Sequence, residues 1–168
     1  MSDQLSPAEQ ALAERIDRLW RAVEWDWYQR GGQNVLYWHW SPTQGWAMNF
    51  PIEGYNECLI TYVLAASSPT HPIPAAAYHE GWARGGRIKN NIDPKKTAPH
   101  LELNHQGVTR SGGPLFWSHY SFLGLDPRRL RDRYADYWRH NVEHTQINRQ
   151  HCIENPMGYR GYGPSAGV

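Results

Sequence analysis

The segment from Tyr37 to His71 holds the side chains best suited to chemistry, because it places aromatic rings and hydrogen-bonding groups beside a carboxylate. The aromatic and polar members are Trp38, His39, Trp40, Trp46, Asn49, Tyr55 and Asn56, and the carboxylate is Glu57. Tryptophan and tyrosine combine a flat apolar face with a polar edge. Sugars present flat C–H faces and hydroxyl edges, so this segment favours a groove that binds a glycan.

Glu57 precedes the most apolar stretch of the chain, residues 58–66, which predicts a helix that is buried on every side. Apolar surroundings favour the neutral form of a carboxyl group. A general acid needs that form to protonate a glycosidic oxygen. The alternative is that Glu57 caps this helix, where the helix dipole favours negative charge and opposes the acid role. The spacing alone leaves both interpretations open.

Other candidate groups carry less information. Glu80 is a second candidate carboxylate, although a glutamate on a helix surface is the favoured interpretation. His140 and His144 lie one helical turn apart, but no third ligand accompanies them, so we expect two polar surface histidines and no metal. Ser118 and His119 lack the glycines of a nucleophile elbow. No phosphate loop or dinucleotide motif is present, so no cofactor is expected.

Local signals predict the elements of the first half of the chain. The first helix is predicted to begin with Ser6 as its N-cap, followed by a proline, Pro7, at the first helical position and a capping-box glutamate, Glu9. Apolar residues follow at helical spacing, and the Gly-Gly pair at residues 31–32 ends this helix. Residues 35–40 and 46–50 are rich in aromatic residues and flank a turn-like segment, which predicts a small β-hairpin or a pair of extended segments.

The second half is expected to be helical around a long loop. Helices are predicted over residues 57–66 and from Pro74 to about Arg84. Residues 85–113 show no helical period and are expected to form a loop, with a short strand at 101–103. Asp126 and Pro127 predict a long helix to about Glu154. Its inward residues are expected to be Leu130, Tyr134, Tyr137, Trp138, Val142 and Ile147. The expected fold class is mainly α with a short β-hairpin and long irregular loops.

Composition excludes several classes of protein. The chain has 17 lysine and arginine residues against 16 aspartate and glutamate residues, so no basic excess indicates nucleic acid. No apolar run approaches the roughly 20 residues of a membrane span. The start of the chain lacks the apolar core of a secretory signal. Cys58 and Cys152 lie beside apolar residues, which favours two buried free thiols, with a disulfide as the alternative.

Longer runs of the chain resemble the glycoamylase-like family, which includes bacterial endo-β-1,2-glucanases and a transglycosylating domain of cyclic β-1,2-glucan synthases. The runs that carry the resemblance include Leu-Tyr-Trp-His-Trp-Ser-Pro at 36–42, Gly-Tyr-Asn-Glu-Cys-Leu-Ile at 54–60, Tyr-His-Glu-Gly-Trp-Ala at 78–83 and His-Tyr-Ser-Phe-Leu-Gly-Leu-Asp-Pro at 119–127. Runs this long and aromatic are more specific than a short motif, and the likeness covers nearly the whole chain.

The resemblance implies an (α/α)6 toroid whose central cleft holds the glycan, and inverting hydrolysis of β-1,2-glucan without a metal or organic cofactor. Glu57 matches the family's glutamate in Asn-Glu-Cys-Leu and is implied to be the general acid. The residues implied to line the cleft are Trp38, His39, Trp40, Asn56, His119 and Tyr120. The implied partner is a polysaccharide or oligosaccharide, and the parent protein is implied to be periplasmic or secreted.

The chain differs from the family in length, since 168 residues are too few to form the full ring of paired helices. We therefore expect residues 1–168 to form a single partial catalytic domain that lacks N- and C-terminal helices of the toroid. Apolar faces exposed in this way would leave it inactive, poorly soluble or both. An inverting enzyme also needs a second carboxylate about 6.5–9.5 Å from the acid. Glu80 is one candidate, and the missing parts are the favoured source.

Three alternatives remain open from the sequence. A transglycosylase of the same family would use nearly the same residues. A non-catalytic glycan-binding module would keep the aromatic groove and lack the base. A structural helical domain would use its aromatic residues only for packing.

Overall fold

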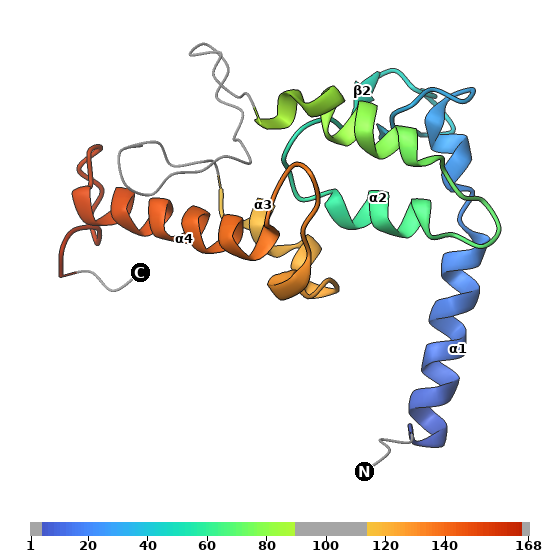
Figure 1. The fold of residues 1–168 in the computed structure, drawn as a ribbon, viewed down its shortest axis with the longest axis horizontal. Coiled ribbons are helices and arrows are strands. Elements are labelled where there is room, and N and C mark those ends of the chain that lie inside the picture. The colour runs from blue at the N-terminus through green and yellow to red at the C-terminus, as the bar shows by residue number, and fades with distance from the viewer. Residues whose placement is uncertain (1–4, 90–113, 166–168) are drawn as a thin grey trace.

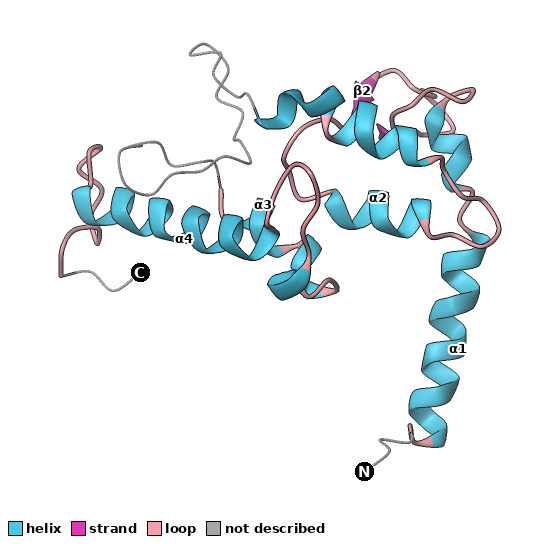
Figure 2. Ribbon diagram, viewed as in Figure 1, coloured by secondary structure: helices cyan, strands magenta, loops and turns pink. Residues whose placement is uncertain are grey.

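The computed structural model describes residues 5–89 and 114–165, and in these ranges the chain is mainly α-helical. The fold class expected from the sequence is confirmed. The α-helices are α1 (Pro7–Ala22), α2 (Leu59–Ala66), α3 (Phe116–His119) and α4 (Tyr137–Glu154), as Figures 1 and 2 show. Short helical turns connect them: η1 (Trp25–Gln29), η2 (Ala77–Trp82), η3 (Arg84–Lys89), η4 (Ser121–Leu123) and η5 (Pro127–Arg129).

Helix α1 begins as its sequence predicts. The Ser6 hydroxyl accepts a hydrogen bond from the Glu9 backbone N–H, and the Glu9 carboxylate accepts one from the Ser6 N–H at 2.8 Å. The expected continuation to residues 31–32 is wrong, because Val23 adopts an extended conformation and ends the helix. Helix α1 buries none of its residues, and Figure 1 shows it projecting away from the rest of the chain.

The predicted hairpin is confirmed in a short form. Strand β1 (Tyr37–Trp38) pairs with β2 (Phe50–Pro51) in antiparallel register, and Trp38 lies opposite Phe50. The base of the hairpin continues beyond the strands through a backbone hydrogen bond of 2.8 Å from the Ile52 N–H to the Leu36 carbonyl. This pairing brings the two aromatic segments of the sequence together.

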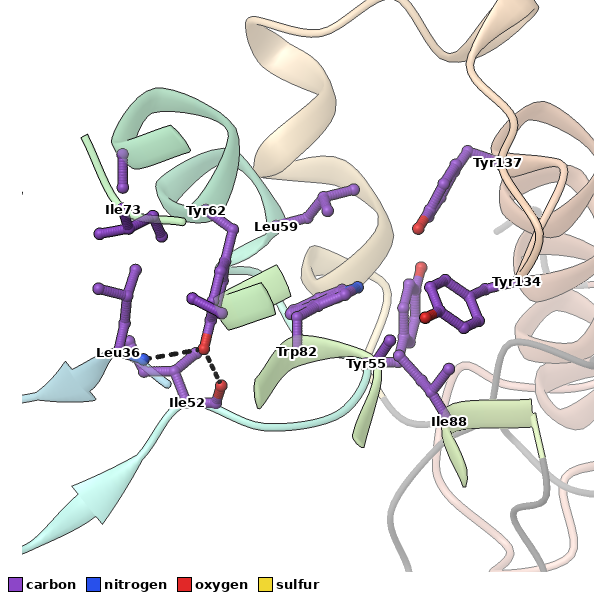
Figure 3. Close-up of a cluster of buried hydrophobic side chains, with 13 residues drawn as sticks. Leu36, Ile52, Tyr55, Leu59, Tyr62, Ile73, Trp82, Ile88, Tyr134 and Tyr137 are labelled. Carbon is purple, nitrogen blue, oxygen red and sulfur yellow. Dashed lines mark hydrogen bonds between the residues drawn. The ribbon is translucent and has the colours of Figure 1, made fainter. Parts of the chain in front are cut away.

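The core lies between the hairpin, α2, η2 and the start of α4 (Figure 3). Tyr62 and Trp82 are among its largest fully buried side chains, and Tyr55 packs edge-on against Trp82. Gly81 allows η2 to approach the hairpin closely, since a Cβ atom there would lie 2.8 Å from the Asn34 carbonyl oxygen. Aromatic residues thus fill much of the space that connects the hairpin to the helices.

Helix α2 begins two residues later than Glu57 and is buried on one side only. Leu59, Tyr62 and Ala65 face the core, whereas Leu64 is exposed. The prediction of burial on every side is therefore wrong. The helix expected from Pro74 is present, but it takes the wider π-helical form over Ala77–Trp82.

The long helix expected from Pro127 is interrupted. After η5, the Asp132 carboxylate accepts hydrogen bonds from the backbone N–H groups of Tyr134 at 2.7 Å and Ala135 at 2.9 Å, which closes a local turn. Asp136 then caps α4 by accepting from the Arg139 N–H at 3.1 Å. A side chain that bonds to its own backbone in this way competes with helix continuation.

The strand expected at 101–103 and most of the predicted loop 85–113 lie outside the described residues, and η3 occupies residues 84–89. Among the helices of the described ranges, none has the length and apolar character needed to cross a membrane.

Candidate functional site

Glu57 lies in a turn just before α2, with its side chain half-buried. Cys58, not Glu57, occupies the N-cap position of α2. Within residues 5–89 and 114–165, no lysine, arginine or histidine forms an ion pair with the Glu57 carboxylate. Its neighbour Glu53 differs in this respect, because Arg84 lies 3.9 Å from the Glu53 carboxylate. The carboxyl group of Glu57 is therefore not engaged by a cation of the described chain.

The backbone around Glu57 is held by a residue far away in the sequence. The Ser121 hydroxyl donates to the Glu57 carbonyl oxygen at 2.7 Å and accepts from the Ile60 N–H at 3.1 Å. Ile60 is one of the first residues of α2, whose backbone N–H groups have no partner within the helix. Ser121 thus supplies the cap that Cys58 does not provide.

Ser118, one turn before Ser121, holds the other side of the same loop. Its hydroxyl shares hydrogen bonds with the Tyr55 hydroxyl and with Nδ1 of His144, and all three side chains are buried. Burial raises the pKa of Tyr55, so the phenol remains protonated at neutral pH. The network joins the Glu57 loop to α3 and α4.

His119 and Tyr120 lie between these two serines and point outward, with Tyr120 59% exposed. His119 lines a cavity of about 460 Å³ beside α4, together with Phe122, Trp138 and Val142. The prediction that Trp138 and Val142 point inward is wrong, since both are exposed on this face of α4. The cavity is mostly apolar where Trp138 and Phe122 form its wall.

The aromatic residues of the hairpin form two groups. In the first group, exposed Trp38 contacts Phe50 edge-on at 5.9 Å between ring centroids and lies 6.1 Å from the His39 ring. In the second, Trp27 lies between Trp40 at 5.2 Å and Trp46 at 4.8 Å. Trp38 is 53% exposed, so its ring face is available to a ligand.

The second group borders another cavity of about 460 Å³, lined by Trp27, Arg30, Trp46, His71 and neighbouring residues of η1. The Arg30 guanidinium lies over the rings of Tyr37 and Trp46, at 4.6 and 5.4 Å from their centroids. His119 and Trp46, both predicted to bind substrate, therefore line different cavities.

The two predicted asparagines make contacts within the chain. Asn49 accepts a hydrogen bond from the Arg30 guanidinium, which ties the hairpin to η1. Asn56 accepts from the Cys58 N–H at 2.9 Å and so stabilises the turn that carries Glu57. Asn49 and His39 both have a positive φ, at 43° and 61°, a conformation in which asparagine and histidine are enriched.

Glu80 lies on η2, and its carboxylate accepts from the Asn34 side-chain amide at 2.9 Å. It is exposed and faces the start of the hairpin, whereas the Glu57 loop is bound by α3 and η4. The described contacts hold the two carboxylates in different surroundings, so a role for Glu80 as the base stays a prediction.

The pKa of the Cys58 thiol is raised to about 11, mainly by burial and further by the negative charge of neighbouring Glu57. Cys58 and Cys152 are both free thiols, as expected, although each is only partly buried. His140 and His144 are buried, at 2% and 0% exposure, so the prediction of two surface histidines is wrong. The described residues contain no group of three or more histidine, cysteine, aspartate and glutamate side chains that could hold a metal.

The exposed aromatic residues could be predicted from the sequence, but the groups that hold the Glu57 loop could not. Nothing in the local sequence of Ser118 and Ser121 indicates a bond to residues more than 60 positions away. The three-residue spacing between them was an available signal, because residues at i and i+3 share one helix face.

The chain is similar to known proteins over nearly its whole length. Residues 49–166 match the family described as "Putative glucoamylase". The chain is 38% identical over 173 residues to an exo β-1,2-glucooligosaccharide sophorohydrolase (non-reducing end) of Parabacteroides distasonis, covering 96% of this chain and 24% of that protein.

Solved structures show the same likeness. An endo-β-1,2-glucanase of Chitinophaga pinensis, in complex with sophorotriose and glucose, is 61% identical with a TM-score of 0.79, over 95% of this chain and 37% of that one. A "putative glucoamylase" of Bacteroides caccae is 57% identical with a TM-score of 0.78, over 95% and 38%. The mainly helical fold and these matches agree with the expected part of an (α/α)6 toroid.

The chain spans between about a quarter and two-fifths of the length of these relatives. The family match itself covers most of the chain, including the Glu57 loop and the two serines that bind it. The chain therefore belongs to the family described as putative glucoamylases.

Proposed function

We propose that this chain carries part of the active site of a glycoside hydrolase that cleaves β-1,2-glucan, with Glu57 as the general acid. The observation that carries the proposal is the position of Glu57, half-buried before α2, without a cationic partner in the described chain and bonded through its carbonyl to Ser121, the residue after the exposed Tyr120. Two of the relatives, the sophorohydrolase and the endo-β-1,2-glucanase, are named for β-1,2-linked glucans or their oligosaccharides, which supports this substrate class.

The chemistry requires a proton for the leaving oxygen and a water molecule on the opposite face of the sugar. In the described part of the chain no cation holds the Glu57 carboxylate, which leaves the group available to face a glycosidic oxygen. The water needs a second carboxylate about 6.5–9.5 Å from the acid for an inverting reaction. Glu80 is the candidate within this chain, and the other source is the additional length that the relatives possess.

The exposed rings supply the binding surface. Trp38 and Tyr120 present faces on which sugar rings can stack, and His39 and His119 lie beside them as hydrogen-bonding groups. Such a surface binds an oligosaccharide without a metal or an organic cofactor. In the whole protein this surface would bind a glucan outside the cytoplasm, in the periplasm or the medium.

The test is to express the longer protein that contains this chain and to measure reducing-end release from linear β-1,2-glucan. β-1,3-Glucan and starch serve as comparison substrates. Release from β-1,2-glucan alone is expected. Transfer products in place of release would favour a transglycosylase, and binding without either product would favour a glycan-binding module.

The role of Glu57 as the general acid is tested by the substitution Glu57→Gln. Glu57→Gln should lower kcat by about 10²–10⁴-fold, the usual contribution of general acid catalysis, while binding of sophorooligosaccharides is retained. Glu53→Gln is the matched control, because Glu53 lies four residues earlier and already faces Arg84. Unchanged turnover in Glu57→Gln would exclude Glu57 as the acid.

A further inference from the structure

Glu57 lies outside regular secondary structure, so no helix or strand fixes its backbone. Gly54 has a φ of 78° and donates to the Trp82 carbonyl at 2.9 Å, which anchors the start of the loop. The hydrogen bonds of Asn56 are local: its side chain accepts from the Cys58 N–H at 2.9 Å and donates to the Glu53 carbonyl at 3.5 Å. The position of the carboxyl group therefore depends on bonds from elsewhere in the fold.

Those bonds come from one short segment that runs through α3 and η4. Ser118 bonds to Tyr55, two residues before Glu57, and Ser121 bonds to the Glu57 carbonyl at 2.7 Å and to the Ile60 N–H at 3.1 Å. Both serines are at most 1% exposed, so water does not compete for their hydroxyl groups. The loop is thus held on both sides of Glu57.

The same segment carries the outward-facing His119 and Tyr120. Three-residue spacing places Ser118 and Ser121 on the buried face of the turn, and the two residues between them lie on the exposed face. His144 on α4 shares a hydrogen bond with Ser118 and so anchors the buried face of the segment. The bonds from Ser118 and Ser121 therefore couple the position of Glu57 to that of the exposed pair.

We propose that Ser118 and Ser121 are positioning residues that hold Glu57 in register with the substrate-facing pair His119 and Tyr120. This inference rests on the proposed function. Neither serine bonds to the Glu57 carboxylate, so their contribution is to its placement and not to its protonation. Misplacement of a catalytic group by about 1 Å can cost up to about 10²-fold in rate.

The first test is kinetic and uses the longer protein that contains this chain. Ser121→Ala should lower kcat on β-1,2-glucan by about 10–100-fold and leave KM within about two-fold, since the binding surface is retained. Ser67→Ala is the matched control, because the Ser67 hydroxyl donates to the Val63 carbonyl at 2.7 Å at the other end of the same helix. A loss in Ser121→Ala no larger than in Ser67→Ala would overturn the proposal.

A second substrate separates positioning of the acid from general destabilisation. A 4-nitrophenyl β-sophoroside has a leaving group that needs little protonation, so displacement of the acid should matter less for it. Ser121→Ala is expected to lose several-fold more rate on β-1,2-glucan than on this glycoside. Equal losses on both substrates would show a merely structural role and overturn the proposal.

Ser121→Cys covers the case in which the alanine variant does not fold. Sulfur fills the space of the hydroxyl but hydrogen-bonds weakly, so this variant should fold and still show the selective loss on the glucan. Wild-type rates on both substrates in Ser121→Cys would contradict the proposal.

Amide hydrogen exchange, measured on the chain of 168 residues, tests the bonds of Ser121 without any measurement of enzyme activity. Ser121→Ala should accelerate exchange of the Ile60 amide by about tenfold or more, because it removes that amide's acceptor. Ser67→Ala should leave this amide unchanged. If the longer wild-type protein does not cleave β-1,2-glucan, the proposed function fails, whereas unchanged Ile60 exchange in Ser121→Ala would refute the positioning bonds themselves.

Discussion

The hydroxyl group of Tyr62 accepts a hydrogen bond from the backbone N–H of Leu36 at 3.0 Å. The same hydroxyl donates to the Ile52 carbonyl at 2.9 Å, so one side chain of α2 bonds to both sides of the hairpin base. Figure 3 shows the two bonds converging on the Tyr62 oxygen. Since Tyr62 is 1% exposed, water cannot replace either bond when the hydroxyl is removed.

Tyr62→Phe is therefore expected to lower the free energy of unfolding by about 1–3 kcal/mol, the cost of leaving buried polar groups without a partner. Chemical denaturation followed by tryptophan fluorescence measures this change. Tyr37→Phe is the matched control, because it removes a hydroxyl whose 3.0 Å bond to the Gln33 side chain is exposed. That control should stay within about 0.5 kcal/mol of the wild type. Similar losses in both variants would show that the burial of the Tyr62 bonds has no energetic consequence.

The substitution Gly81→Ala is expected to cause a steric clash where η2 contacts the hairpin. A methyl group there would lie 2.8 Å from both the Asn34 carbonyl and the Tyr62 hydroxyl, and 2.9 Å from the Val35 Cα. Two of these atoms belong to the backbone and cannot move aside easily, so Gly81→Ala should destabilise the fold by about 1–3 kcal/mol or more. Thermal unfolding measures the loss.

Gly124→Ala provides the comparison for that prediction. The nearest atom to its added methyl group is the Ile60 Cδ1 at 3.8 Å, an ordinary contact, and its φ of −115° suits any residue. The melting temperature of Gly124→Ala should stay close to that of the wild type. The steric argument fails if the two alanine variants melt together.

Alkaline pH should destabilise the fold. Burial raises the pKa of Tyr55, Tyr62, Tyr78 and Tyr137 and raises that of Cys58 to about 11. These groups keep their protons in the folded state at a pH where the unfolded chain has released them. The unfolded state then binds fewer protons, so the free energy of unfolding falls as pH rises. The decline should begin near pH 9, where unfolded cysteine and then tyrosine ionise.

Melting temperatures measured between pH 7 and pH 11 test this prediction. Cys58→Ala should flatten the curve between about pH 9 and pH 10, because Cys58 is the raised group that ionises first in the unfolded chain. Cys152→Ala controls for the loss of a thiol as such. A melting temperature that stays constant up to pH 11 would contradict the assigned direction.

The apolar stripe of α1 should cause the chain to self-associate. Leu12, Ile16 and Leu19 are 58%, 57% and 63% exposed and lie on one face of the helix. A contiguous exposed apolar face of this kind favours aggregation or a protein contact. Sedimentation velocity is expected to show species larger than a monomer that grow with concentration.

Replacement of all three residues by glutamine should restore a monomer without lowering the melting temperature, because α1 buries none of its residues. The double variant Ala11→Gln with Ala13→Gln leaves the stripe intact and should still associate. A wild-type chain that stays monomeric at high concentration would refute the prediction.

The features that depend on neighbouring residues could be predicted from the amino-acid sequence. The capping box at Ser6 and Glu9, the hairpin and the mainly helical class were all predicted correctly, because their signals act over a few residues. The exposed Trp38 and the half-buried Glu57 also follow from local pattern. Their roles in binding and catalysis remain predictions.

Contacts between distant segments determine the burial of His140 and His144, the turn at Asp132 and the bonds from Ser118 and Ser121 to the Glu57 loop. Asp132, for example, also accepts from the Tyr78 hydroxyl of η2, more than 50 residues away. The energy of a buried hydrogen bond depends on the partner that folding brings to it and on the exclusion of water around both. Local sequence contains neither, so it cannot tell a surface polar residue from one that holds the site together.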